Sequence, residues 1–201
     1  MFKFKSIYLT PLLLLLLLFI FPKTDINAAE IKVGDYTLDK VSIVEDDLYI
    51  SADTVVIEGV VDGDLFVEAK NITVGGTVTG DIYLFGTNTY VNGNIYGNAV
   101  VIGSTVNITG THKGNVYVGA VTADLDGTFN KDVLVLSGTL NLDGTVGDDV
   151  RVLSTQVISN ASVGDDFLIS SDNYSVNEDD IYGELVSPSD SVFTDRETND
   201  F

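Results

Sequence analysis

Apolar and polar residues follow a fixed 17-residue frame between Val41 and Val176. Eight copies follow one another without insertion or deletion, and positions 8, 10, 15 and 17 of the copies are mostly apolar. Apolar residues two positions apart have the periodicity of a β-strand, and the many Gly and β-branched residues disfavour a helix. This pattern predicts a β-solenoid, in which each copy forms one coil and neighbouring coils bury a continuous core. The copies begin at Val41, Glu58, Gly75, Asn92, Thr109, Asp126, Asp143 and Asn160.

Small and turn-forming residues mark the corners of each coil. Position 2 is Gly in six of the eight copies, and position 12 is always Ala, Gly or Ser. Glycine adopts positive φ and allows close backbone approach, as a tight bend requires. Position 7 is Asp or Asn in all eight copies, which suits a turn where the side chain accepts backbone N–H groups. We therefore predict three short strands and three corners per coil, with coils about 4.8 Å apart.

The predicted fold class is all-β, a single-stranded parallel β-helix with 17-residue coils. Eight full coils would make a rod roughly 38 Å long. A partial closing coil is expected next, because residues 181–185 (Ile-Tyr-Gly-Glu-Leu) resemble residues 95–99 (Ile-Tyr-Gly-Asn-Ala) after a shift of one residue. The expected segments are a signal peptide at 1–28, a lead-in at 29–40, the β-helix domain at 41–186 and an acidic disordered tail at 187–201.

The N-terminal segment at 1–28 has the form of an export signal. Lys3 and Lys5 precede an apolar run from Leu12 to Phe21, and residues 26–28 (Ile-Asn-Ala) supply a cleavage site. The apolar run is short for a membrane span, which needs about 20 residues, so an uncleaved membrane anchor is the less favoured alternative. The protein is therefore expected to be exported, and to act in the cell envelope or outside the cell.

Composition excludes several kinds of chemistry. The chain has no Cys, which rules out disulfides and thiolate metal sites. Its net charge is −20, and loss of the three Lys and one Asp within residues 1–28 makes it −22. A chain so acidic repels nucleic acid and anionic lipid, so nucleic acid is not an expected partner.

The two ends of the predicted rod are candidate assembly surfaces. Inner coils satisfy their strand edges through their neighbours, whereas terminal coils expose unpaired N–H and C=O groups unless they are capped. We expect end-to-end pairing between copies of the chain. The alternative is capping by residues 31–40 and 178–186. The candidate end residues are Val41, Ile43, Leu48, Phe167, Ile169 and Tyr174.

An apolar stripe on the outside of the rod is a second candidate surface. Position 9 should point outward, because positions 8 and 10 on either side of it are apolar and point inward. The stripe favours lateral pairing or binding of a cell-envelope polymer, since apolar patches on solvent faces mark interaction sites. The alternatives are cover by a terminal segment, or aromatic rings that only stack along the sheet. The position 9 residues concerned are Tyr49, Phe66, Tyr83, Tyr117, Leu134 and Leu168, and position 11 adds Phe85, Ile102, Leu136 and Leu153.

The ladder of acids at position 7 suggests two roles. Carboxylates about 4.8 Å apart repel one another, and a hard cation such as Ca²⁺ would relieve that repulsion. The repeat lacks the Gly-rich nonapeptide of calcium-binding β-rolls, and turn capping by Asp and Asn explains the column without metal. We favour turn capping and expect no metal and no cofactor.

The sequence offers little for catalysis. His112 is the sole His, it occupies the otherwise apolar position 4, and we expect it in the core or at a corner. No Cys nucleophile exists, and the Ser and Thr residues lack a His partner that could activate them. The gapless frame also leaves no loop on which to build an active site. We therefore expect a protein that is not an enzyme.

Three segments resemble the bactofilin family of polymer-forming cytoskeletal proteins. They are Val-Asp-Gly-Asp-Leu at 61–65, Val-Thr-Gly-Asp-Ile at 78–82 and Val-Gly-Asp-Asp-Val at 146–150. The resemblance covers about residues 41–186. It implies a right-handed triangular β-helix that joins end to end into filaments without nucleotide and acts as a scaffold at the membrane or cell envelope.

The export-type N-terminus changes what the resemblance implies. Family members are typically cytoplasmic and carry only a short membrane-targeting stretch before the helix. We therefore expect a self-assembling scaffold in the cell envelope or outside the membrane. Its expected partner is a second copy of the chain, and an envelope polymer or the membrane is a further candidate. The alternative function is that of a monomeric extracellular rod that recognises glycan or protein through the apolar stripe.

Overall fold

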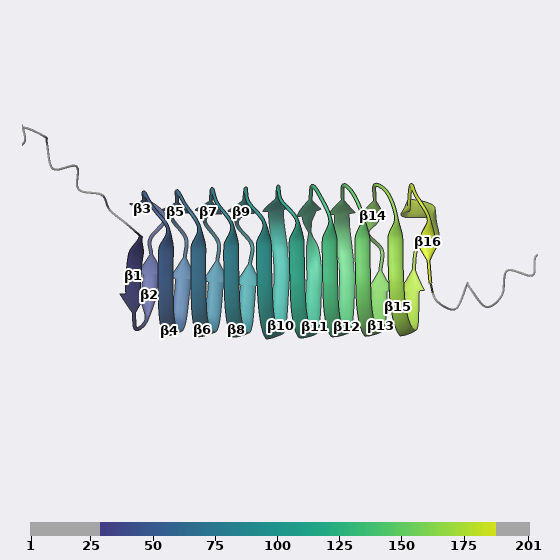
Figure 1. Cartoon of the computed structure of the whole chain (residues 1–201), viewed down its shortest axis with the longest axis horizontal. Coiled ribbons are helices and arrows are strands. Elements are labelled where there is room, and N and C mark those ends of the chain that lie inside the picture. The colour runs from purple at the N-terminus through teal and green to yellow at the C-terminus, as the bar shows by residue number, and fades with distance from the viewer. Residues whose placement is uncertain (1–28, 188–201) are drawn as a thin grey trace, which may run out of the picture.

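The computed structural model describes residues 29–187, which wind into a rod of stacked coils (Figure 1). All pairing between strands is parallel, and the rod has about nine turns of about 17 residues. Figure 1 shows β1 (Glu30–Val33) and β16 (Leu185–Val186) at opposite ends of the rod. The predicted β-solenoid is confirmed.

Long strands carry most of the fold, and each of them bends round at least one corner of its coil. Shorter strands complete the coils. The long strands are β4 (Leu48–Ile57), β6 (Leu65–Val74), β8 (Ile82–Val91), β10 (Ala99–His112), β11 (Val116–Phe129), β12 (Val133–Val146), β13 (Val150–Ser159) and β15 (Phe167–Val176). The short ones are β2 (Tyr36–Leu38), β3 (Ile43–Val44), β5 (Val60–Val61), β7 (Thr77–Val78), β9 (Asn94–Ile95) and β14 (Ser162–Val163), and one 3₁₀ turn, η2, spans Glu178–Asp180.

The 17-residue period is also the register of the sheet. Leu48 pairs with Leu65 and Val116 pairs with Val133, so each repeat position stacks on the same position of the next coil. Pairing covers positions 8–12, stops at position 13, and resumes over positions 14–17. Positions 3 and 4 pair separately. The rod therefore has three faces: a wide face (positions 8–12), a second face (positions 14–17) and a narrow face (positions 3 and 4).

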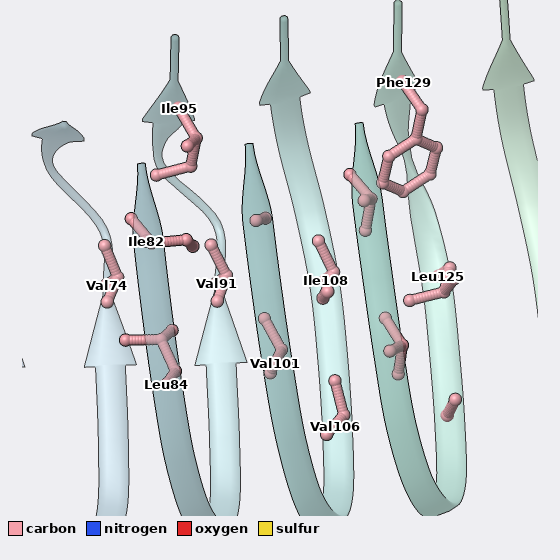
Figure 2. Close-up of a cluster of buried hydrophobic side chains, with 14 of the residues drawn as sticks. Val74, Ile82, Leu84, Val91, Ile95, Val101, Val106, Ile108, Leu125 and Phe129 are labelled. Carbon is pink, nitrogen blue, oxygen red and sulfur yellow. The ribbon is translucent and has the colours of Figure 1, made fainter. Parts of the chain in front are cut away.

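The core fills the space between the three faces. Figure 2 shows side chains such as Leu84, Val101 and Val106 pointing into the space between facing strands, and all three are fully buried. Inward positions 4, 8, 10, 15 and 17 supply most of the buried residues. Full burial of one such side chain stabilises the fold by about 1.5–3 kcal/mol. Because each coil covers the next, this core runs the length of the rod.

Glycine at position 2 is required mainly by close packing between coils. A Cβ added to Gly76 would lie 1.9 Å from the carbonyl oxygen of Gly59, and one added to Gly93 would lie 2.0 Å from that of Gly76. Only Gly110 and Gly144 combine this crowding with a positive φ, of 80° and 83°. No L side chain fits at these corners without displacing the neighbouring backbone.

The lead-in forms a coil of its own, which the repeat pattern does not predict. In the wide face Glu30 of β1 pairs with Leu48 of β4, and in the second face Tyr36 of β2 pairs with Val55 of the same strand. The offset is one residue longer than the 17-residue repeat in the wide face and two residues longer in the second face. The frame shifts because residues 39–42 make a four-residue corner before β3, whereas the equivalent corner in the next coil contains only residues 58 and 59. The rod consequently begins earlier than Val41.

The closing coil agrees with its prediction. Leu185 pairs with Phe167 and Ile181 bridges Val163, and each offset is one residue longer than the repeat. The extra residue lies in the segment that contains η2. The one-residue shift expected from the sequence is therefore confirmed.

Two of the predicted segments lie outside the described residues, apart from residue 187 at the start of the acidic tail. These are the signal peptide at 1–28 and residues 188–201 of the acidic tail. Within residues 29–187, no helix is long and apolar enough to cross a membrane.

Candidate assembly surfaces

The apolar stripe occupies the outside of the wide face, at positions 9 and 11. In its N-terminal half, Phe66 stacks between Tyr49 and Tyr83, with ring centroids 4.6 and 4.4 Å apart and interplanar angles of 4° and 9°. Aromatic pairs of this kind contribute about 0.5–1.5 kcal/mol beyond the area they bury. The expected stacking along the sheet is present, so the rings lie face to face along the rod and turn their edges to solvent.

The C-terminal half of the stripe is aliphatic. Leu134, Leu136, Leu153, Leu168 and Val186 border an open hollow of about 430 Å³. The hollow lies over β12, β13, β15 and β16, and leucines at position 11 remain more than half exposed. A smaller hollow of about 240 Å³ lies on the same face at the other end of the rod, against Ile31, Tyr49, Phe66 and Phe85. Tyr117, the remaining predicted stripe residue, is exposed between the two halves.

Charge on the stripe is sparse and balanced. Among the described residues at positions 9 and 11 of the wide face, Glu68 and Arg151 are the only charged ones. Arg151 extends toward the edge of the face, where its guanidinium contacts Asp149 and lies 3.3 Å from a carboxylate oxygen of Asp132. The stripe therefore has no net charge, although the whole chain carries −20.

The acids at position 7 form hydrogen bonds that connect successive coils. The backbone N–H of Asp64 donates to Oδ1 of Asp47 at 2.8 Å, and that of Asn98 donates to Oδ1 of Asp81 at 2.6 Å. Asn98 continues the ladder as an acceptor for the N–H of Asn115 at 3.0 Å, because an amide oxygen accepts as a carboxylate does. The turn-capping interpretation is confirmed, and the side chain caps the next coil.

Two groups of acids near the C-terminal end lie close enough to share a cation. Their carboxylate oxygens lie within 4.8 Å of one another in each group, and repulsion from Asp166 in particular raises the pKa of Asp165. Oxygen ligands of this kind suit a hard cation such as Ca²⁺. The groups are Asp132, Asp148 and Asp149, and Asp149, Asp165 and Asp166.

His112 is a core residue, as expected from its apolar column. It is fully buried on the narrow face, its ring lies 5.4 Å from that of Phe129, and its Nε2 lies 2.9 Å from the carbonyl oxygen of Thr109. Within the described part of the chain, its Nδ1 has no hydrogen-bond partner. Burial lowers the pKa of His112, because the imidazolium form would lose its hydration. A substrate in solution cannot reach this ring.

Three of the six predicted end residues do not lie at the ends of the rod. Leu48 is fully buried beneath Glu30 of β1, and Phe167 is fully buried beneath Leu185 of β16. Ile169 is buried on the same face. The lead-in and closing coils cover these positions, so their assignment to open ends is wrong. Val41 is 93% exposed and Ile43 is 62% exposed, and both remain at the N-terminal end.

The two ends of the rod carry different chemistry. In the lead-in coil the inward positions 8 and 10 hold Glu30 and Lys32, which form an ion pair, and Lys32 Nζ lies 5.7 Å from the centre of the Tyr36 ring. At the other end, the second-face part of β15 pairs with β13 and with no other described strand. Tyr174 therefore occupies an inward position and is still 36% exposed.

Comparison with protein-family models, with curated proteins and with solved structures found no match.

Proposed function

We propose that this chain is a self-assembling, non-enzymatic scaffold of the bactofilin-like type, which forms filaments by end-to-end contact in the cell envelope or outside the membrane. The observation that carries the proposal is the open C-terminal edge. Asn173 to Val176 pair on one side with β13, and among the described residues no strand pairs on their other side. An edge strand with free N–H and C=O groups is a template for another chain. Tyr174 adds an apolar surface to that edge.

The N-terminal end supports a weaker contact. Charged residues that point inward on an edge strand oppose edge-to-edge pairing, because their burial against another apolar core is unfavourable. Glu30 and Lys32 occupy such positions. We expect filaments to nucleate through the C-terminal end and to grow through the N-terminal end with lower affinity.

The shape of the rod supports a structural role. Every register between β4 and β15 joins identical repeat positions of successive coils, so no loop leaves the rod between Leu48 and Val176. Active sites on such scaffolds need groups that reach solvent together, and His112 is buried. The export-type residues 1–28 and the acidic composition support a place outside the membrane.

Electron microscopy of the protein comprising residues 29–201, which contains every described strand, tests the proposal. We expect filaments whose width matches single or paired rods. Tyr174→Arg should shorten or abolish them, because the charge would be buried at the contact. Tyr90→Arg is the control, since Tyr90 is an exposed tyrosine on the same face in the middle of the rod. Equal filament lengths for both variants would contradict end-to-end contact.

The alternative function is a monomeric rod that binds glycan through the stacked rings of Tyr49, Phe66 and Tyr83. Two of these residues, Tyr49 and Phe66, border the smaller hollow of the wide face, where a ligand would lie. Monodisperse rods at high protein concentration, together with glycan binding that Phe66→Ala abolishes, would support this alternative and exclude the scaffold.

A further inference from the structure

We propose that the wide face is a lateral interface, through which two copies of the rod pair antiparallel about a twofold axis. The axis lies between β10 and β11 and runs along the strands. This contact does not use the ends of the rod, so it goes beyond the end-to-end contacts proposed above. Three observations on the stripe carry it: the placement of its two charges, a glycine at its centre, and its extent.

The order of the strands defines which residues would meet. The wide face contains ten strands in the order β1, β4, β6, β8, β10, β11, β12, β13, β15 and β16. An antiparallel pair centred between β10 and β11 places β6 opposite the second copy's β13. A twofold axis along the strands preserves their direction, so each repeat position faces the same position of the partner.

The two charges of the stripe match in this arrangement. Glu68 lies on β6 and Arg151 on β13, at positions 11 and 9, so each lies diagonally opposite the other across the interface. Two residues along a strand span about 7 Å, and to cover them Arg151 would leave its partly exposed ion pairs with Asp149 and Asp132 on its own rod, which contribute about 0–1 kcal/mol each. A parallel pair would instead bring Glu68 near the second Glu68 and Arg151 near the second Arg151. Like charges across an interface are unfavourable, so Glu68 and Arg151 favour the antiparallel arrangement, although it also brings the position 7 aspartates of the two copies to the same edge.

Gly119 provides a matching shape at the centre. Unlike the crowded corner glycines, it has free space around it, because an added Cβ would meet only the Ile102 side chain at ordinary distances of 3.6 and 3.8 Å. The fold of a single rod therefore does not require glycine at this position. Ile102 on β10 projects next to it and is 49% exposed. Under the twofold axis, Ile102 of each copy meets the Gly119 hollow of the other.

The extent of the face suits a specific dimer. The eight strands from β4 to β15 are each about 16 Å long over positions 8–12 and about 4.8 Å apart, and with the shorter β1 and β16 they give roughly 700 Å² per copy. A standard protein–protein interface buries about 800 Å² per partner. The aromatic half of one copy would cover the aliphatic half of the other, including the hollow beside Leu153 and Leu168. A glycan would account for the aromatic half alone.

Charge reversal tests the pairing of Glu68 with Arg151. The protein of residues 29–201 would carry Tyr174→Arg in every sample, so that end contacts do not contribute, and sedimentation equilibrium would give the dimer dissociation constant. We expect Glu68→Arg and Arg151→Glu each to raise it at least tenfold, and the double exchange to restore it to within about threefold of the parent. The proposal would be overturned if the protein that carries Tyr174→Arg alone is a monomer, or if neither single charge change weakens its dimer. Either result would leave the proposed end-to-end contacts untouched.

Gly119→Leu separates the interface from the fold. The leucine has room on a single rod, so the melting temperature should not fall, whereas the side chain would clash with Ile102 of the second copy and abolish the dimer. An unchanged dimer would overturn the central contact. Glycan binding that is lost in Gly119→Leu, with no dimer in the parent, would assign the stripe to a ligand instead.

Cross-linking tests the antiparallel direction, since the native chain contains no Cys. Ser51 on β4 and Ser170 on β15 are exposed at position 11 and would face each other across the interface. A short bis-maleimide should join Ser51→Cys to Ser170→Cys when the two variants are mixed, because facing sheets lie about 10 Å apart. Neither variant should cross-link alone. Cross-linking of Ser51→Cys to itself would establish a parallel pair and overturn the proposal.

Discussion

Oδ1 of Asp64 accepts a hydrogen bond of 2.8 Å from the backbone N–H of Asp81, the residue at the same repeat position in the next coil. The same bond recurs along most of the corner at position 7. Each side chain thus satisfies a backbone donor that the parallel ladder leaves unpaired at the corner. The ladder of acids depends on oxygen acceptors, and two of its members are uncharged asparagines.

Replacement of Asp64 tests whether the acceptor or the charge matters. Asp64→Ala should lower the free energy of unfolding by about 1–2 kcal/mol, because the partly buried N–H of Asp81 loses its acceptor. Asp64→Asn keeps the acceptor and should stay within about 0.5 kcal/mol of the native chain. Urea unfolding followed by circular dichroism would measure both. If Asn destabilises as much as Ala, the carboxylate charge is essential and capping is not the main role.

Buried His112 should make stability depend on pH. Because its pKa in the folded protein is lowered, the unfolded chain binds a proton more readily. Above the ordinary pKa of about 6.5, the ring is neutral in both the folded and the unfolded chain, and burial of the neutral ring does not lower stability. As pH falls through about 6.5 toward the lower pKa of the folded protein, the unfolded chain takes up a proton first, and the free energy of unfolding decreases. His112→Ile, which copies the Ile95 that occupies this position in the preceding coil, removes this contribution.

Thermal unfolding between pH 7.5 and pH 5 would measure the effect. The melting temperature of the native chain should fall relative to that of His112→Ile below about pH 6.5, and the difference should be constant above pH 7. The comparison cancels the contribution of carboxylates, including Asp165, which both proteins share. Parallel curves over the whole range would show that the histidine is protonated equally in both states.

Two glycines should respond in opposite ways to alanine. Gly76→Ala places a Cβ 1.9 Å from the carbonyl oxygen of Gly59, so it should destabilise the rod by about 1–3 kcal/mol or more. Gly119→Ala fills open space on a strand and should be neutral or stabilise by about 0.5–1 kcal/mol. Thermal or urea unfolding of the pair provides the comparison. Equal destabilisation by the two substitutions would show that the fold of a single rod requires glycine at position 119.

The ion pair in the lead-in coil should limit growth at the N-terminal end. Glu30→Leu combined with Lys32→Val gives this coil the apolar inward residues that positions 8 and 10 carry in the other coils. We expect longer filaments or bundles by electron microscopy, because an inward charge no longer opposes edge pairing. Asp126→Leu, at an exposed corner in the middle of the rod, is a control for loss of charge. Unchanged filament length in the double variant would show that this end is not a contact.

The repeat predicts the coils from Val41 to Val176 well, because a parallel ladder at constant offset requires coils of equal length. The same reasoning fails at the lead-in. A corner of four residues at 39–42 shifts its frame, and Glu30 and Lys32 stand where the repeat carries apolar residues. A terminal coil faces solvent on one side, so it tolerates polar residues that an inner coil would not.

The candidate surfaces are predictable only in part. Alternation within a strand indicates that Tyr49, Phe66 and Tyr83 face outward, as they do. Sequence cannot distinguish Gly119 from a corner glycine, since the difference lies in what surrounds the missing Cβ. Nor does it reveal the proposed pairing of Glu68 with Arg151, because that pairing depends on how two rods meet.

The equal length of the inner coils has an evolutionary consequence. Duplication or loss of 17 codons between Leu48 and Val176 would lengthen or shorten the rod by one rung of about 4.8 Å and leave both tips unchanged. The number of repeats thus sets the length of the rod, and the distance between its two ends can change through gain or loss of repeats alone. On the wide face, the same event would move the centre of symmetry by half a rung, so rods of unequal length would pair out of step.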